Sequence, residues 1–455
     1  MNFPEYYKQR EILLKRVCYR NYRCKQGKRM ILVNIRTHTT VFLEDLSADF
    51  FEILAKADTN EIGRFLSENE LSLAEAEEFI RDLCENGILG GQSFQNPKHF
   101  GESGPTNDER KALLEFQEEL YENGFLFHVH IDITNRCNLR CLHCYHPFEE
   151  YAHQTEVTLE SLKTFIDEIY ELGAFSITLS GGESLLRKDF WEIVKYISKK
   201  GMLLSFFTNG ISIQEEDIIR IRQSCVQKIG VSLYAIEETI HDKITQLPGS
   251  CIKTKRALEA LKQTDVLIEV KCVLMKDNFS QYKEMAAYCQ ENGFSFLLDT
   301  SMSPKLNGDT NPLNLAPSYE QFVEFSLDES FWGFVKEKKP MDWKREPCSA
   351  GRYSLYIDPL GNVYPCVSLR LKLGTMKEIG AIWKDSEELK KWQQITRKDF
   401  RGCGEEESCE FCMEICAGIC LLENGNFLDG KTSACRKAQA RQEAYRRLSK
   451  RNNLL

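Results

Sequence analysis

Short apolar runs alternate with amphipathic stretches through the middle of the chain. The apolar runs lie at residues 127–134 (FHVHIDIT), 175–180, 203–209, 228–235, 267–275 and 294–300. Between them, stretches such as LESLKTFIDEIYEL place apolar residues at helical spacing. Six strands separated by helices indicate a parallel sheet. We therefore predict a partial barrel of six βα units over residues 127–335, with its chemistry at the C-terminal ends of the strands.

Residues 1–95 follow a different pattern. MILVNIRT and TTVFL indicate two short strands, and three helical stretches follow them. Two strands and three short helices predict a small winged-helix-like domain. A polar linker and a bridging helix, over residues 96–126, are expected to connect this domain to the barrel.

The last part of the chain, residues 336–455, has little regular periodicity and is rich in cysteine. Its eight cysteines are Cys348, Cys366, Cys403, Cys409, Cys412, Cys416, Cys420 and Cys435. Such a segment is poorly equipped to form an apolar core, so we expect bound metal to order it.

The overall composition is that of a globular protein. The chain has 455 residues, of which 42% are hydrophobic, and its length indicates two to four domains. The apolar runs are too short to span a bilayer, and MNFPEYYKQREILLKR does not resemble a signal peptide. We therefore expect a cytoplasmic protein, in which the 18 cysteines are reduced thiols rather than a disulfide framework.

Charge is unevenly distributed. The net charge of -9 argues against a protein that coats nucleic acid. Residues 1–40 carry ten Lys or Arg against two Glu, whereas residues 41–95 carry three basic and thirteen acidic residues. The basic segment could steer an acidic peptide or could simply be solvated. DNA-recognition helices should be basic, and the predicted helices here are acidic.

Three cysteines, Cys137, Cys141 and Cys144, directly follow the first barrel strand in the stretch NRCNLRCLHCYH. Three thiolates can hold three irons of a 4Fe-4S cluster and leave the fourth iron without a protein ligand. The alternative is a zinc site with His143 or His146 as its fourth ligand. The C-x3-C-x2-C spacing is uncommon for zinc, so we favour the cluster.

This motif, after the first strand of a βα barrel, resembles the radical S-adenosylmethionine (SAM) superfamily. In that family SAM chelates the open iron, and an electron from the cluster cleaves SAM to a 5'-deoxyadenosyl radical that abstracts a hydrogen atom. The resemblance implies SAM contacts at the strand ends of this chain: His143, Gly181, Gly182, Glu183, Thr208, Asn209 and Ser232.

Each of these contacts has an expected role. Gly181 and Gly182 would let the backbone approach a ligand closely, and Glu183 would accept from the ammonium group of SAM. Lys243 lies where a cation could meet the carboxylate of SAM, but a solvated helix lysine is favoured. Asp299 ends the sixth strand and is a general-base candidate on position alone, with a turn aspartate favoured. No catalytic residue is identified.

The cysteine-rich tail resembles the SPASM extension of radical SAM enzymes, which usually carries two auxiliary 4Fe-4S clusters. The resemblance implies a first auxiliary cluster on Cys348, Cys366 and Cys420, and a second on Cys409, Cys412, Cys416 and Cys435. Two features depart from the family. Three residues separate Cys412 from Cys416 where the family commonly has five, and Cys403 lies outside the usual seven-cysteine pattern. Cys403 either completes the first auxiliary cluster or leaves that cluster with an open iron; a zinc knot is the alternative.

The first 95 residues resemble the peptide-recognition element of enzymes that modify ribosomally made peptides, a domain similar to the pyrroloquinoline quinone peptide chaperone. In that family a leader peptide adds as a strand to the edge of the sheet. The combination predicts a radical SAM maturase that installs a cross-link in a precursor peptide, most simply a thioether from cysteine sulfur to carbon. An external electron donor such as flavodoxin or ferredoxin is expected, and neither nucleic acid nor a membrane.

Several alternatives remain open at this stage. The same chemistry could make a carbon-carbon link, dehydrogenate or epimerise a peptide, or mature a sulfatase. From another class, an iron-sulfur redox sensor acting as a winged-helix regulator would bind DNA and would not cleave SAM. A non-catalytic electron carrier would have no use for the strand-end motifs.

Overall fold

The computed structural model describes residues 3–14, 16–89, 107–151, 154–331, 333–335, 337–338, 341–413 and 415–452. The polar linker, up to residue 106, lies outside the described residues. The predicted bridging helix is α5 (Asn107–Glu122).

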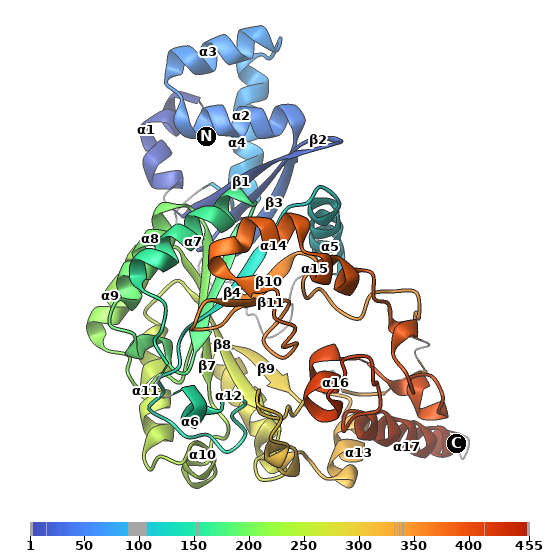
Figure 1. Cartoon of the computed structure of the whole chain (residues 1–455). Helices are drawn as coiled ribbons and strands as arrows, with labels where there is room; N and C mark the ends of the chain where they lie inside the picture. Colours follow the sequence, from blue (N-terminus) through green and yellow to red (C-terminus); the bar gives the residue numbers. More distant parts are fainter. Residues whose placement is uncertain are drawn as a thin grey trace.

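The central sheet contains the six predicted parallel strands in consecutive order. They are β4 (His128–Thr134), β5 (Ser176–Gly181), β6 (Leu203–Thr208), β7 (Val226–Ser232), β8 (Leu267–Val273) and β9 (Ser295–Asp299). The helices between them are α6 (Phe148–Tyr151), α7 (Leu159–Glu171), α8 (Phe190–Lys199), α9 (Glu215–Gln223), α10 (Glu238–Thr245), α11 (Ser250–Leu261) and α12 (Tyr282–Asn292). The predicted α/β partial barrel is confirmed (Figure 1).

The alternation of side chains along the strands separates an apolar face from a polar one. Ile131, Ile177 and Phe206 belong to the main core, together with apolar residues of α7 and α8. Because successive residues of a strand point to opposite faces, His130 and Thr178 lie on the other face. The barrel therefore presents polar side chains on the face that its helices do not cover.

The cysteine-rich region adds strands to this sheet. β10 (Ser354–Ile357) pairs in parallel with β4, and β11 (Asn362–Tyr364) and β12 (Gly374–Thr375) continue antiparallel, which makes nine strands. The helices of this region are α14 (Ile379–Asp385), α15 (Glu387–Gln393), α16 (Ala417–Asn424) and α17 (Cys435–Asn452). Another helix, α13 (Tyr319–Leu327), precedes the region. The segment therefore contains strands and helices that its sequence did not indicate, because strands this short leave almost no periodic pattern.

The N-terminal domain has three antiparallel strands, one more than the pattern predicts. They are β1 (Val17–Cys24), β2 (Gly27–Asn34) and β3 (Thr39–Glu44), in that order across the sheet. Its helices are α1 (Phe3–Leu14), α2 (Asp45–Lys56), α3 (Thr59–Glu68) and α4 (Leu73–Glu85). β1 and α1 were missed: VCYRNYRC is too polar to indicate a strand, and its partly buried pattern depends on β2 and α5.

This small sheet joins its own helices to the barrel. Met30 and Leu32 pack in the cluster formed with the helices of the domain. Ile31 and Val33, on the opposite face, share a second cluster with Phe116 of α5 and with Phe127, which precedes β4. The domain therefore sits at the end where the barrel strands begin, as Figure 1 shows.

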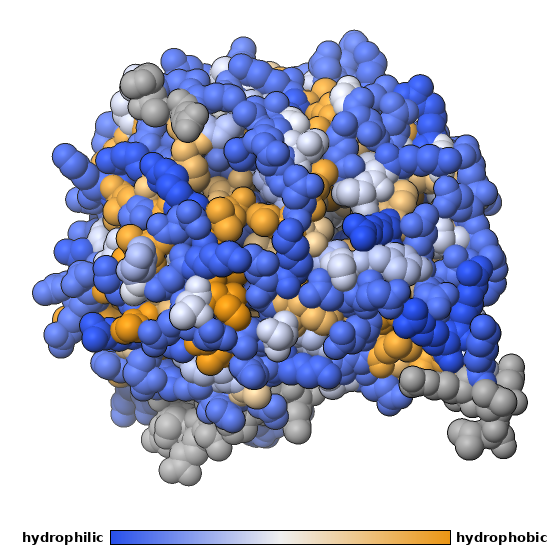
Figure 2. Space-filling model, turned by 90° about the horizontal axis from the view of Figure 1, so that it is seen from below, coloured by the Kyte–Doolittle hydropathy of each residue, from blue (hydrophilic) through white to orange (hydrophobic). Residues whose placement is uncertain are grey.

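The face of the molecule that is seen from below is largely hydrophilic (Figure 2). On the face seen from below, hydrophobic side chains occur in separate smaller areas between hydrophilic ones (Figure 2). Within the described part of the chain, no helix has the length and apolar character needed to cross a membrane.

Candidate active site

The loop that carries Cys137, Cys141 and Cys144, the cysteine loop, is held by the ends of β4 and β5. The backbone N–H of Gly182 donates to the carbonyl of Thr134 at 2.8 Å, and that of Glu183 donates to the carbonyl of Arg136 at 2.8 Å. A Cβ atom on Gly181 would lie 2.3 Å from the oxygen of Thr134, and one on Gly182 would lie 2.3 Å from the oxygen of Arg136. The close approach made by the two glycines is thus to the cysteine loop; an approach to a ligand stays a prediction.

Cys137, Cys141 and Cys144 share one half-buried neighbourhood. Burial raises the pKa of each thiol, and the neighbouring thiols raise the pKa of Cys141 and Cys144 further; that of Cys144 reaches about 11. A bound cation reverses this penalty and stabilises the thiolates. Within the residues that the structure describes, no three His, Cys, Asp or Glu side chains converge on a single-ion position. The fit to a cluster therefore rests on the grouping of the thiols and on the loop geometry.

Glu183 is the centre of a buried hydrogen-bonded group. One carboxylate oxygen accepts from Oγ1 of Thr208 at 2.7 Å, and the other accepts from the backbone N–H of Asn209 at 2.7 Å. The side chain of Asn209 donates to Oδ1 of Asn138, in the cysteine loop, at 2.7 Å. Burial raises the pKa of Glu183, although these hydrogen bonds lower it. The structure thus brings together three of the predicted SAM contacts from two strand ends.

A second group forms around Tyr234, which follows β7. Its ring centroid lies 4.6 Å from that of His143, edge to face. Burial raises the pKa of Tyr234 well above its usual value, the charge of Cys141 raises it further, and a hydrogen bond with Ser232 lowers it. Burial lowers the pKa of His143 to about 4, and its Nδ1 has no hydrogen-bond partner among the described residues. The imidazole is therefore neutral near pH 7, and its free nitrogen suits a polar ligand.

Sequence reasoning missed Tyr234, which stands inside an apolar run, and it missed Asp132. Asp132 is fully buried, accepts from the hydroxyl of Tyr356 at 2.7 Å, and has the ring nitrogens of His130 and His146 at 3.3 and 3.4 Å. Burial would raise the pKa of Asp132, but the two histidines lower it. The sequence signal that could have indicated Asp132 is the alternation in HVHID, in which every second residue of β4 is polar. Tyr356 comes from β10, whose place beside β4 no local pattern indicates.

The side chains of Lys243, considered for the carboxylate of SAM, and Asp299, considered as a general base, are both exposed to solvent. Lys243 forms an ion pair with Asp277 at 2.9 Å, and 62% of its side chain is exposed. Asp299 is exposed and accepts from the backbone N–H of Ser301 at 2.7 Å. The favoured interpretations, a solvated lysine and a turn aspartate, agree with these positions.

The tail cysteines fall into two neighbourhoods. In the first, the backbone N–H of Leu369 donates to Sγ of Cys366 at 3.2 Å. The start of α16 presses on this turn, because a Cβ on Gly418 would lie 2.5 Å from Cβ of Ser368. Burial, with the neighbouring thiols of Cys416 and Cys348, raises the pKa of Cys366 to about 12. The thiols of Cys416 and Cys348 are thus near enough to Cys366 for their charges to act on it.

The second neighbourhood contains Cys403. The loop at residue 401 pairs with residue 429, and a Cβ on Gly430 would lie 2.1 Å from Sγ of Cys403. The thiol of Cys435 donates to the carbonyl of Gly430 at 3.9 Å. Burial raises the pKa of Cys403 to about 11, with further contributions from three neighbouring thiols, which are Cys435, Cys412 and Cys409. Cys420 is buried, and burial raises its pKa to about 12. The charge of Cys416 raises this pKa further, and so do those of Cys403 and Cys435 from the second neighbourhood.

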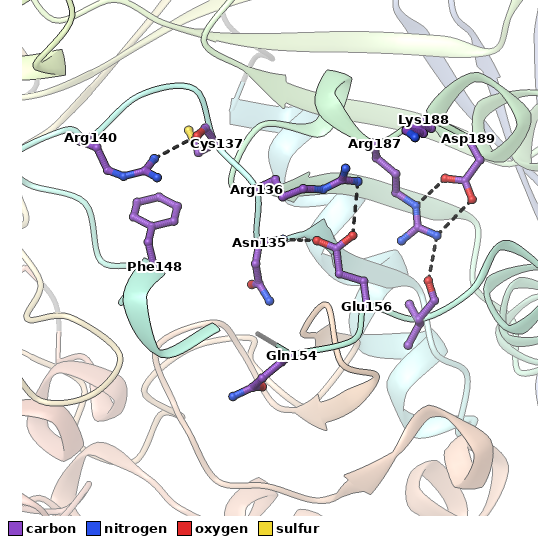
Figure 3. A pocket seen from close by; sticks show the side chains of 11 residues that line it. Asn135, Arg136, Cys137, Arg140, Phe148, Gln154, Glu156, Arg187, Lys188 and Asp189 are labelled. Carbon is purple, nitrogen blue, oxygen red and sulfur yellow. Dashed lines mark hydrogen bonds and ion pairs between the residues drawn. The ribbon is translucent and has the colours of Figure 1, made fainter. Parts of the chain in front are cut away.

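A pocket of 670 Å³ opens beside the cysteine loop (Figure 3). Its lining residues are Asn135, Arg136, Cys137, Arg140, Phe148, Gln154, Glu156, Val157, Arg187, Lys188 and Asp189. Glu156 fixes the end of β4 by accepting from Oγ1 of Thr134 at 2.6 Å and from the backbone N–H of Asn135 at 2.9 Å. Four of the lining residues are basic and two are acidic, so the pocket is positively charged.

Two protein families match this chain. The radical SAM superfamily matches residues 131–295, and the SPASM iron-sulfur cluster-binding domain matches residues 348–416. Together with the partial barrel and its cysteine loop, these matches define the chain as a radical SAM enzyme with a SPASM domain. Its cofactors are a 4Fe-4S cluster that binds SAM and auxiliary iron-sulfur clusters in the tail. The class is enzymatic, as predicted, which sets aside the regulator and the electron carrier.

Among individual proteins, the chain is similar to the AdoMet-dependent heme synthase of Oleidesulfovibrio alaskensis, with 24% identity over 63% of this chain and 80% of that protein. It is also similar to the mycofactocin maturase MftC of Mycolicibacterium smegmatis, with 27% identity over 67% and 81%. The crystal structure of Streptococcus suis SuiB bound to precursor peptide SuiA has the same fold, with a TM-score of 0.59 and 15% identity over 92% of this chain and 98% of that one.

Proposed function

We propose that this radical SAM enzyme is a peptide maturase, which binds the leader of a ribosomally synthesised precursor peptide and installs a cross-link in its core. The cross-link that we propose is a thioether between a cysteine sulfur and a carbon atom. The observation that carries the proposal is the N-terminal domain, whose β3 pairs with β2 alone among the described strands. The likeness of the whole fold to SuiB, crystallised with a precursor peptide, supports it.

The two edges of the small sheet are not equivalent. β1 faces the barrel, since the hydroxyl of Tyr22 donates to the carbonyl of Gly173 at 3.0 Å and Arg20 donates to that of Tyr170. β3 is the opposite edge, and Thr40 on it is exposed. An extended peptide that adds to β3 would gain main-chain hydrogen bonds without displacing any strand.

The proposed ligands of the SAM-binding cluster are Cys137, Cys141 and Cys144, and the proposed SAM contacts are His143, Gly181, Gly182, Glu183, Thr208, Asn209 and Ser232. For the tail we propose one auxiliary cluster on Cys403, Cys409, Cys412 and Cys435, and another on Cys348, Cys366, Cys416 and Cys420. This division follows the two neighbourhoods of thiols. Relative to the family pattern, it moves Cys416 to the first auxiliary cluster and places Cys403, which the pattern leaves out, in the second. We retain the proposed domains at 1–95, 96–126, 127–335 and 336–455.

When bound, SAM and the clusters supply a 5'-deoxyadenosyl radical that abstracts hydrogen, and a path for the surplus electron. The chain itself holds the reacting groups in place. Glu183, fixed by Thr208 and Asn209, offers a buried negative charge to an ammonium group. His143, packed edge to face on Tyr234, offers a neutral ring beside the cysteine loop.

The chemistry of the product separates the thioether from its alternatives. Formation of a thioether breaks one S–H and one C–H bond and forms one S–C bond. The peptide therefore loses two hydrogen atoms, and it also loses a thiol that iodoacetamide could alkylate. A carbon-carbon link or dehydrogenation loses the hydrogens but keeps the thiol, and epimerisation changes neither. Mass spectrometry of the alkylated product therefore tests the proposed bond.

A proline at the free edge tests the role of the N-terminal domain. Thr40→Pro removes a backbone N–H from β3 and adds a ring that hinders strand addition, so we expect the Kd of a fluorescent leader peptide to rise about tenfold or more. Thr59→Pro is the matched control, because Thr59 is the first residue of α3, where proline is tolerated. Fluorescence anisotropy measures the affinity, and thermal unfolding confirms that both variants fold. An unchanged Kd in a folded Thr40→Pro protein would contradict the docking proposal.

A further inference from the structure

Three exposed cations surround the mouth of the pocket beside the cysteine loop. We call Arg136, Arg140 and Lys188 the cationic rim; all three are exposed, and the side chain of Arg136 keeps 52% of its surface in solvent. They come from two segments that are distant in sequence, the cysteine loop and the turn after β5. Figure 3 shows them around one opening.

The acidic residues of the pocket leave much of this charge uncompensated. Asp189 pairs with Arg187, at 2.6 Å from Nε, and Arg187 is itself buried and donates to the carbonyl of Ile133 at 2.6 Å. Glu156 lies 3.5 Å from Arg136. Lys188 has no acidic side chain within ion-pairing distance in the part of the chain that the structure describes. The rim therefore presents a net positive charge to solvent.

One cation of the rim is fixed to the cysteine loop. The guanidinium of Arg140 donates to the carbonyls of Cys137 at 2.9 Å and Leu139 at 2.7 Å, and it lies 4.8 Å from the ring centroid of Phe148. Cys137 lines the pocket. The rim thus surrounds an opening that leads from solvent to one of the three proposed ligands of the SAM-binding cluster.

The charge of the rim differs in sign from that of the whole chain, which is -9. A negatively charged partner protein is repelled by most of the surface of this acidic chain and attracted to the cationic rim. The electrostatic field of the chain therefore orients the partner as it approaches. The 4Fe-4S cluster proposed on the cysteines beneath the rim requires an electron from an external donor. Both facts favour the same partner.

We propose that the cationic rim docks an acidic one-electron donor protein of the flavodoxin class, which reduces the SAM-binding cluster through this face. In the step, the anionic hydroquinone of the flavin becomes the neutral semiquinone and the 4Fe-4S cluster gains the electron; no bond to the protein changes and no proton is transferred. The inference rests on the proposed function, since it requires a reducible cluster at the cysteine loop.

The experiment compares two reductants on matched variants of the full chain with reconstituted clusters. The rim variant is Lys188→Glu, and the control, Lys111→Glu, changes the net charge equally on the exposed surface of α5. Anaerobic stopped-flow absorbance follows oxidation of a photoreduced flavodoxin. Dithionite at high ionic strength is the second reductant, and 5'-deoxyadenosine is the product measured.

We expect the rim variant to react with flavodoxin about tenfold more slowly at low salt, and its rate to depend less on ionic strength, whereas the control matches the wild type. SAM cleavage with dithionite should be equal in all three proteins. Equal flavodoxin rates in the rim variant and the wild type would overturn the docking inference. A parallel loss with dithionite would also overturn it, because the rim would then serve the active site. Failure of the wild type to cleave SAM with dithionite would instead refute the proposed function.

Discussion

At the scale of single residues, the G-G-E motif has a structural task as well as the predicted contact with SAM. Gly181 and Gly182 let two strand-end loops touch, and Glu183 ties the end of β6 to them. The motif could be found in the sequence by family resemblance. Its close contact with the cysteine loop could not, because that depends on the parallel pairing of β4 with β5.

Gly182→Ala tests this structural task. The added Cβ would meet the carbonyl of Arg136 at 2.3 Å and push the cysteine loop away, so we expect the reconstituted protein to lose about four irons per chain, those of one 4Fe-4S cluster. Gly63→Ala in α3 is the control, since a Cβ there meets nothing within 4 Å and should stabilise the helix by about 0.5–1 kcal/mol. Iron analysis provides the measurement; full iron content in Gly182→Ala would refute the argument.

At the scale of elements, short pieces of chain decide which tail cysteines meet. The pairing of residue 401 with residue 429 takes Cys403 to the side of Cys435, and the start of α16, directly after Cys416, contacts the turn after Cys366. The presence of two clusters could be predicted from the number of cysteines. The division that we propose could not be predicted, because loop spacing does not specify which loops are neighbours.

Pairs of substitutions test the division. If Cys403 and Cys409 hold the same cluster, Cys403→Ser with Cys409→Ser should cost about four irons, as each single variant does, whereas Cys403→Ser with Cys366→Ser should cost about eight. Cys289→Ser, at a buried thiol of α12, is the control and should cost none. Iron analysis with Mössbauer spectroscopy distinguishes the results. A loss of about eight irons in the first pair and about four in the second would instead place Cys403 in the same cluster as Cys366.

At the scale of the whole molecule, the N-terminal domain and the cysteine loop lie at opposite ends of the barrel strands. The sheet of the domain packs where the strands begin, and the loop follows the point where β4 ends. The proposed leader binding and the radical chemistry would therefore depend on separate surfaces.

Replacement of the whole triad, Cys137, Cys141 and Cys144, by alanine should separate these activities. We expect iron content to fall from about twelve to about eight per chain, because two auxiliary clusters of four irons remain. Production of 5'-deoxyadenosine should cease, while the Kd for the leader peptide stays within about twofold of the wild type, since residues more than about 10 Å apart act independently. Iron analysis, chromatography and anisotropy give the three values. SAM cleavage by this variant at the wild-type rate would refute the central claim.

The sequence by itself determined the six barrel strands, the cysteine triad, the strand-end motifs and the richness in tail cysteines, because each is a local pattern of hydrophobic spacing or residue type. Only the tertiary structure decided what meets across the chain. β10 brings Tyr356 to Asp132, the start of α16 contacts the turn after Cys366, and the turn after β5 brings Lys188 to the pocket that Arg136 also lines. Such contacts depend on strand pairing and packing between distant segments, which local spacing does not encode.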